Sequence, residues 1–478
     1  MTAAPVTPAR SPSWPLVAGA AVLLIVAAVA VTRWYTVPAP QFLLLTTLVG
    51  LAGLAAVATG THPAILLSAG IVLSPLAGNW AYLGLPQFVA PDRMLIAVAV
   101  LAAVLRVPAV RDRPPLRIGP AHVVLGAYAA YVVLSALVWG TLFADPLRVI
   151  DRMGLSAFAV FLVAPLIFFT ERDRRVFGWM LVALGGYLAV TAVMESTAAR
   201  GFVVPAFIAD PALGIHFGRA RGPFLDAATN AFAMFSCATA ALIMRGRTDD
   251  GRLRALCLLV IAGCALGVLL SLQRSAWVGA SLATLLTFIS FRELRPWLLP
   301  ALVVGVLGVC AAFTFVPGLS TAADTRANAQ GSVWDRQNLN AAAVNMFLDR
   351  PLIGHGWDTF ERVGNDFFWQ GADYPLTAQA KTGVHNVVLA RLSELGLIGT
   401  TLWIVGIGLA LLSGLVGPRS PALRPWRIGL FALSVYFVVL LLVTPMAGTF
   451  TLLLLLTWAG LAAGPAALGR VADSTPTP

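Results

Sequence analysis

Two arginines and a histidine stand where polar sequence meets apolar sequence, and their types suit the chemistry of phosphate esters. Arg274 lies in Leu-Ser-Leu-Gln-Arg-Ser-Ala-Trp, Arg336 in Val-Trp-Asp-Arg-Gln-Asn, and His385 in Gly-Val-His-Asn. A guanidinium donates two parallel hydrogen bonds to a phosphate and keeps its charge. A histidine, with a pKa of about 6.5, can accept a proton at neutral pH. Together these groups could bind a phosphate-bearing substrate and activate a hydroxyl.

Each of the three residues also has a plainer interpretation, which the sequence leaves open. Arg274 can be an arginine that reaches the membrane interface, because an arginine at the centre of a membrane helix costs about 2.5–3.5 kcal/mol. Arg336 can be a solvated residue at a helix start, although a cation there opposes the helix dipole unless an anion is near. His385 can be a hydrogen-bonded structural histidine.

The segment around Arg336 predicts an amphipathic helix over roughly 335–348. Arg336 and Asn340 share one face of it, at i and i+4. Pro351 ends the helix, and a turn at Gly354-His355-Gly356 follows. Its apolar positions recur at helical spacing: Leu339, Ala342, Ala343, Met346 and Phe347.

Two further patterns near this helix have structural interpretations. Arg391 and Glu394, at i and i+3, are expected to form an ion pair. Six aromatic residues are candidates for stacking on sugar rings and equally for interfacial anchoring or packing. They are Trp334, Trp357, Phe367, Phe368, Trp369 and Tyr374.

The composition places these residues in a membrane protein. The chain has 478 residues, of which 59% are hydrophobic and 11% charged, with a net charge of +11. Soluble domains are about 25% charged. The apolar residues form runs of about 16 to 22, long enough to cross a hydrocarbon core of about 30 Å. Alternating strands typical of a β-barrel are missing from the sequence. We therefore expect an all-α polytopic membrane protein with about 12–14 transmembrane helices.

Arginine clusters set the orientation that we expect. Five of them, at 106–117, 172–175, 245–254, 292–295 and 419–427, are separated by even numbers of spans and fall on one side. The positive-inside rule makes that side cytoplasmic, with both termini, in a multi-pass protein of the inner (cytoplasmic) membrane. The predicted spans are 15–32, 38–58, 63–77, 94–105, 121–142, 154–170, 177–195, 227–244, 255–272, 275–291, 298–316, 395–415, 428–444 and 447–465.

This topology divides the chain into five parts. N-terminal membrane helices occupy 1–226, central ones 227–316 and C-terminal ones 395–467, and the tail 468–478 is expected to be disordered. The large hydrophilic segment 317–394, with its amphipathic helix, lies in an extracytoplasmic loop. Cations on that side run against the positive-inside bias and point to an anionic partner. They are Arg200, Arg219, Arg221, Arg274, Arg326, Arg336, Arg350, Arg362, Lys381 and Arg391.

The sequence lacks the motifs that are typical of several reaction types. The chain has no P-loop motif, no Asp-x-Asp pair on the outer face and no closely spaced histidines of the kind that bind zinc. We therefore expect no metal, no cofactor and no nucleic-acid partner. Because ATP is cytoplasmic, a substrate used at the outer loop must arrive already activated.

Four segments, in order, resemble the O-antigen ligase/O-antigen polymerase superfamily of bacterial envelope proteins. They are Arg221-Gly-Pro-Phe-Leu-Asp-Ala-Ala-Thr-Asn230, Gln273-Arg274-Ser275, Arg336 to Phe360 with its Pro-Leu-Ile-Gly-His-Gly core, and His385-Asn386 through Ser393-Glu-Leu-Gly-Leu-Ile-Gly399. The resemblance covers roughly residues 221–415 and is carried by the order of the motifs. The family's Ser-Arg pair appears here as Gln273-Arg274.

The resemblance implies a GT-C-like fold and a metal-independent, inverting glycosyltransferase of polysaccharide biosynthesis. The donor would be a glycan on a polyprenyl diphosphate such as undecaprenyl diphosphate, and the acceptor a hydroxyl of a glycan, lipid or wall anchor. It places catalytic roles on Arg274, Arg336 and His385. Arg221 is a candidate substrate-binding residue, and Asn340, Asn386 and Trp334 beside these motifs are candidates of the same kind.

Two other classes of protein remain open. A transporter or flippase of lipid-linked glycans would carry buried charges midway through several spans, or paired broken helices. A non-catalytic scaffold for envelope assembly would account for the helices but not for the Arg/Arg/His set. The sequence does not separate a ligase from a polymerase.

Overall fold

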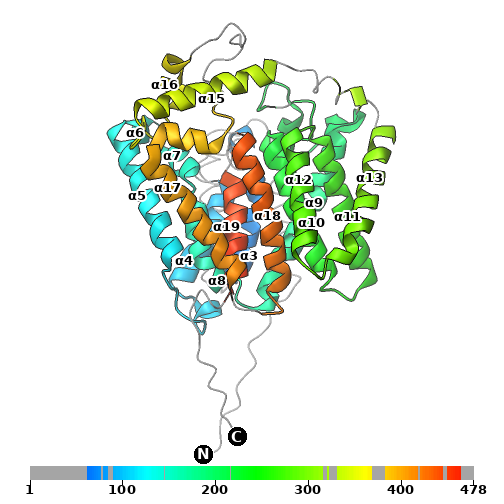
Figure 1. Ribbon diagram of the computed structural model, residues 1–478. Helices are drawn as coiled ribbons and strands as arrows, with labels where there is room; N and C mark the ends of the chain where they lie inside the picture. Colours follow the sequence, from blue (N-terminus) through cyan, green and yellow to red (C-terminus); the bar gives the residue numbers. More distant parts are fainter. Residues whose placement is uncertain are drawn as a thin grey trace, which may run out of the picture.

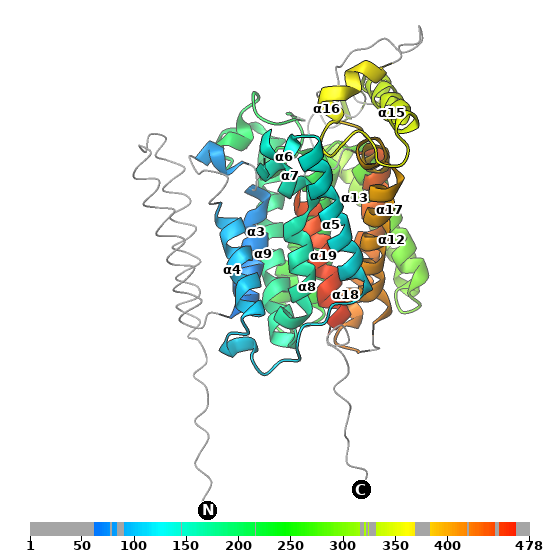
Figure 2. The same ribbon diagram turned by 90° about the vertical axis from the view of Figure 1, so that its left-hand side faces the viewer.

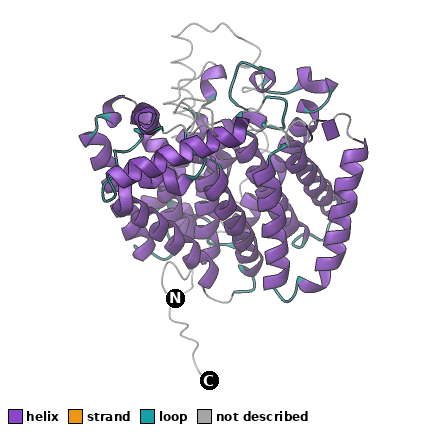
Figure 3. Ribbon diagram, turned by 45° about the horizontal axis from the view of Figure 1, so that its top comes forward, coloured by secondary structure: helices purple, strands orange, loops and turns teal. Residues whose placement is uncertain are grey.

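The protein is described here by a computed structural model that covers residues 62–76, 79–83, 90–144, 146–215, 217–315, 320–321, 324, 331–368, 383–417, 420–444 and 449–464. Within these ranges the regular elements are helices, and no strand occurs (Figure 3). The α-helices are α3 (Pro63–Leu73), α4 (Pro91–Val104), α5 (Pro120–Val138), α6 (Thr141–Ala144), α7 (Pro146–Met153), α8 (Leu155–Ile167), α9 (Glu171–Glu195), α10 (Ala227–Arg245), α11 (Gly251–Leu270), α12 (Arg274–Ser290), α13 (Leu298–Phe315), α15 (Gly331–Asp349), α16 (Phe360–Val363), α17 (Val387–Val416), α18 (Arg424–Val443) and α19 (Thr449–Ala463).

The prediction of an all-α, multi-pass membrane protein is confirmed. Seven of the described helices are long and apolar enough to cross a membrane. Each predicted span from 63–77 onward coincides with a helix, whereas the predicted spans 15–32 and 38–58 lie outside the described residues. The seven are Pro120–Val138, Glu171–Glu195, Ala227–Arg245, Gly251–Leu270, Arg295–Phe315, Val387–Val416 and Arg424–Val443.

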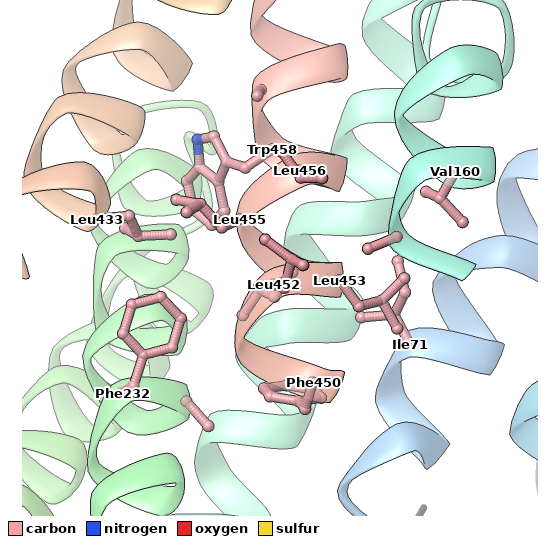
Figure 4. Close-up of a cluster of buried hydrophobic side chains, with 14 of the residues drawn as sticks. Ile71, Val160, Phe232, Leu433, Phe450, Leu452, Leu453, Leu455, Leu456 and Trp458 are labelled. Atoms are coloured by element: carbon pink, nitrogen blue, oxygen red, sulfur yellow. The ribbon is translucent and has the colours of Figure 1, made fainter. Parts of the chain in front are cut away.

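Helix α19 forms the centre of the bundle. Its residues Phe450–Ala463 are all buried, as expected of a helix that is apolar on every side. Figure 4 shows its leucines between Ile71 of α3, Val160 of α8, Phe232 of α10 and Leu433 of α18. Helix α13 is the opposite case, because nearly all of its apolar surface is exposed and suits contact with lipid.

The arginine clusters meet at the end of the bundle opposite α15. Arg113 pairs with Asp173 at 3.0 Å, and Arg424 pairs with Glu293 at 2.7 Å. Arg247 pairs with Glu171 at the start of α9. These pairs join the loops that carry the clusters, so the clusters that they involve lie at one end as expected. That this end is cytoplasmic stays a prediction.

Helix α15 lies across the other end of the bundle, above the upright helices (Figure 1). The predicted amphipathic helix is therefore present, over Gly331–Asp349. Its predicted apolar face is buried against Phe360 and Val384, and Phe347 is half-buried at the margin. The buried positions are Leu339, Ala342, Ala343 and Met346. Figure 2 shows α6, α7 and α16 at the same end of the molecule.

Helix α17 is broken at Gly396, whose φ of 61° and ψ of −164° are not helical. The break leaves backbone groups without partners inside the helix, and segment 351–356 forms hydrogen bonds with them. Leu397 N–H donates to Pro351 O at 2.8 Å, and Ile398 N–H donates to Leu352 O at 3.2 Å. In return, His355 N–H donates to Ser393 O at 3.0 Å, and Gly356 N–H donates to Glu394 O at 2.8 Å. We call this exchange the backbone interlock of residues 351–356 with 393–398.

Glycine is required in the interlock because the two backbones touch. A Cβ on Gly396 would lie 2.4 Å from the carbonyl carbon of Leu352, and a Cβ on Gly354 would lie 2.4 Å from that of Glu394. Both glycines also have positive φ. The break thus tilts the first segment of α17, residues 387–395, away from the membrane-crossing segment that follows.

We expect Gly396→Ala to lower the free energy of unfolding by about 2 kcal/mol or more, because the new Cβ meets backbone atoms and the left-handed conformation disfavours alanine. The measurement is thermal unfolding of the purified protein in detergent. Gly408→Ala is the matched control in the same helix, since its Cβ meets nothing within 4 Å. Equal melting temperatures for the two variants would contradict the interlock.

Candidate functional site

The three candidate catalytic residues come from three elements at the α15 end of the bundle. Arg274 is the first residue of α12 and is exposed. Arg336 lies in the second turn of α15, and His385 stands just before α17, half-buried. Val384 packs in the apolar cluster of α15, so this helix and the start of α17 meet directly.

Arg336 is in an electrostatic environment that suits an anion. Burial lowers the pKa of its guanidinium, and the positive charge of Arg274 lowers that pKa further. The two cations are therefore close enough to repel each other. Arg336 Nε is buried without a hydrogen-bond partner among the described residues, and so is Asn340 Oδ1 one turn later. An anionic ligand between the arginines would relieve the repulsion, and a ligand hydroxyl would satisfy the amide oxygen.

Gln273 has a structural task at the start of α12. Its side chain is nearly buried, and its Oε1 accepts a hydrogen bond from Arg219 Nη1 at 2.7 Å. Its Nε2 donates to Ser275 Oγ at 3.2 Å. Arg219 is thereby held beside the residue that precedes Arg274. In the sequence, Arg219 is one of many cations expected on the same side, and its position two residues before Arg221 is the signal that could have indicated a site role.

Arg221 is placed differently from the other arginines. Only 1% of the residue is exposed, and its Nη2 donates to Ile208 O at 2.9 Å and to Asp210 O at 2.6 Å. Its Nη1 donates to Leu213 O. These carbonyls belong to one loop, so Arg221 holds that loop in shape. The geometry gives it a structural role, and its predicted contact with substrate stays a prediction.

The other candidate binding residues occupy helix starts. Asn386 is the N-cap of α17, where its Oδ1 accepts a hydrogen bond from Leu389 N–H at 3.1 Å. Trp334 is half-buried in the first turn of α15. The cap orients the backbone that presents His385.

The remaining expectations near the site have mixed outcomes. The Arg391–Glu394 ion pair is confirmed, at 3.5 Å. Trp357 is fully buried beneath the Arg391 guanidinium, which is 4.2 Å from the ring centroid, so its role is packing. Phe367 and Phe368 pack against the apolar cluster of α15. Four predicted residues lie outside the described residues: Arg326, Trp369, Tyr374 and Lys381.

Ligands for a metal do not gather in the part of the chain that the structure describes. Groups of three or more His, Cys, Asp or Glu side chains with the required proximity are missing there.

Residues 257–404 match the family described as O-antigen ligase. The matched region runs from α11 into α17 and contains Arg274, Arg336 and His385, whereas Arg221 precedes it. No curated protein matches the chain.

Arg336 and Arg221 should respond oppositely to loss of charge. Arg221→Gln removes hydrogen bonds from a charged group to buried carbonyls, and we expect it to lower the free energy of unfolding by about 2–3 kcal/mol. Arg336→Gln removes a half-buried charge that another cation repels, so the melting temperature should stay equal or rise. Thermal unfolding in detergent without donor measures both. Equal destabilisation by the two variants would make Arg336 a structural residue.

Proposed function

We propose that this chain transfers a glycan from a polyprenyl-diphosphate-linked donor to an acceptor hydroxyl, a function that the match of residues 257–404 to the O-antigen ligase family supports. The reaction would take place at the α15 end of the bundle. The arginine distribution predicts that this end faces the outside of the cytoplasmic membrane.

One observation carries this proposal: Arg336, whose Nε is buried without a hydrogen-bond partner among the described residues, lies near enough to Arg274 for the positive charge of Arg274 to act on its guanidinium. A lipid diphosphate brings several negative charges to the membrane interface, and two forked donors suit its oxygens. When the bond between the sugar and the diphosphate breaks, further negative charge develops on the leaving oxygen. Fixed cations at that point stabilise the transition state more than the ground state.

The remaining step needs a proton acceptor. The acceptor hydroxyl oxygen would attack the anomeric carbon of the donor as the bond from that carbon to the phosphate oxygen breaks. The hydroxyl proton would pass to the imidazole of His385, and the lipid diphosphate would leave with its bonding electrons. Attack opposite to the leaving group inverts the anomeric centre. A general base of this kind contributes about 10²- to 10⁴-fold in rate.

Two features of the fold favour an enzyme over a flippase. Transporters use broken helices to line a substrate site within the membrane. The break in α17, by contrast, is filled by the backbone of residues 351–356. The helices long and apolar enough to cross a membrane carry their charged residues near their ends, or before the break in α17. Charged groups that could act on a substrate therefore gather at the end of the bundle and not midway through it.

A complementation experiment tests the proposal. In a strain that lacks the gene, we expect wild type to restore mature envelope polysaccharide. His385→Ala and Arg336→Gln should leave lipid-linked precursor to accumulate outside the membrane, because chemistry fails after the donor has arrived. The measurement is the size distribution of the polysaccharide beside the amount and sidedness of the precursor.

Arg362→Gln is the matched control, because Arg362 is an exposed cation of the same loop, and all variants are compared at equal membrane levels. It should complement like wild type. Full complementation by His385→Ala would show that His385 is not the general base. Accumulation of precursor on the cytoplasmic side would favour a flippase. Lost chain length indicates a polymerase, whereas lost attachment of full-length chains indicates a ligase.

A further inference from the structure

Four charged side chains join α7 to the loop that follows the interlock. Arg148 contacts both acids, with Nε 2.8 Å from Asp358 Oδ2 and Nη2 2.8 Å from Glu361 Oε1. Arg152 pairs with Asp358 and lies 3.3 Å from Glu361 Oε1. The arginines and Glu361 are each about one third exposed, and Asp358 is buried. We call these four residues the clasp.

A buried ion pair extends the clasp into the bundle. Arg391 lies over the ring of Trp357, the residue before Asp358, and its Nη2 donates to Arg152 O at 3.5 Å. Glu394 pairs with Arg391 and accepts a hydrogen bond from Phe360 N–H at 3.4 Å. The six charges balance, three positive against three negative. They connect α7, residues 357–361 and the first segment of α17.

The direction of this first segment of α17 must be set by contacts with other elements. The break at Gly396 separates it from the membrane-crossing part of the helix, so the axis of the long helix does not fix its direction. The buried residues of α15 and α16 belong to an apolar cluster of their own, apart from the main core. They pack on the same segment, which reaches the main core through apolar contacts of Val387 and Leu395 and a hydrogen bond from the Tyr131 hydroxyl to Leu395 O at 3.2 Å. The clasp and the buried pair add charged contacts from this region to α7, which is part of the bundle.

Ion pairs at partly exposed positions add little stability. We therefore expect these pairs to restrict the relative position of the elements that they join. An apolar contact tolerates sliding, whereas paired arginines and carboxylates accept a narrow range of positions. Catalytic groups on different elements need such control, because a displacement of about 1 Å can cost about 100-fold in rate.

We propose that Arg148 and Arg152 are positioning residues that fix α15, α16 and residues 383–395 relative to the bundle, and so fix His385 and Arg336 relative to Arg274. This inference rests on the proposed function for its catalytic consequence. The mechanical part, a fixed position of α15 over α12, can be measured without any substrate.

The experiment measures the distance between two spin labels by pulsed electron paramagnetic resonance. One label is placed at Gln337→Cys, exposed on α15, and the other at Val278→Cys, exposed on α12. Cys310→Ser removes the exposed native thiol, while the other cysteines are buried. The full chain in nanodiscs should give one narrow distance distribution. Arg148→Gln/Arg152→Gln should broaden it.

The same variants are then assayed for glycan transfer in the complementation strain. We expect Arg148→Gln/Arg152→Gln to lose about 10- to 100-fold in transfer. Arg148→Lys/Arg152→Lys, which keeps both charges, should recover much of the narrow distribution and of the activity. Arg175→Gln is the matched control, because Arg175 is an exposed arginine that pairs with Glu171 at 3.3 Å. This pair lies at the start of α9, at the end of the bundle opposite α15. Arg175→Gln should change neither readout.

The outcomes separate the two proposals. An unchanged distance distribution overturns the positioning role, and so does a broadened distribution with full transfer. A broadened distribution in a protein whose wild type transfers nothing supports the mechanical part and overturns the proposed function. If the double variant does not fold, Glu361→Gln removes the half-exposed carboxylate alone and is judged by the same criteria.

Discussion

The part of the candidate site formed by α15 and the start of α17 depends on the backbone interlock at Gly396. Backbone groups within or near a membrane must find partners, and a broken helix leaves several without one. Here segment 351–356 supplies them, and its own donors find partners in the carbonyls of Ser393 and Glu394. The exchange fixes where α17 leaves the bundle and where the loop from α15 arrives. Two motifs that are far apart in the sequence are therefore one structural unit, and their glycines mark where the two backbones touch.

Much of the fold could be predicted because its signals are local. Apolar runs of sufficient length gave each described membrane helix, and the spacing of Leu339, Ala343 and Met346 gave α15 with its buried face. The break in α17 could not be predicted in the same way. A glycine within an apolar run is compatible with an unbroken helix, and Gly408 in the same element is helical. What distinguishes Gly396 is the distant backbone that approaches it, and the local sequence does not contain that information.

The candidate site divides in the same manner. A cation at a polar edge of an apolar run is visible in the sequence, which identified Arg274 and Arg336. Its partner is not visible, because a guanidinium binds a carbonyl oxygen as readily as a phosphate oxygen. Arg221 and Arg336 looked alike for that reason, yet one is surrounded by loop carbonyls and the other faces a second cation. Arg219 was underrated because its link to Gln273 joins two separate motifs.

The repulsion between the two site arginines links the site to the elements that carry it. Arg274 and Arg336 come from different elements, so repulsion between them acts to push α15 away from α12. The fold resists through contacts that do not involve either arginine: the interlock, the apolar cluster of α15 and the ion pairs to α7. An anion that binds between the guanidinium groups reverses the sign of this force and draws the same elements together. A diphosphate would then be at once the ligand of the site and the last interaction that closes it.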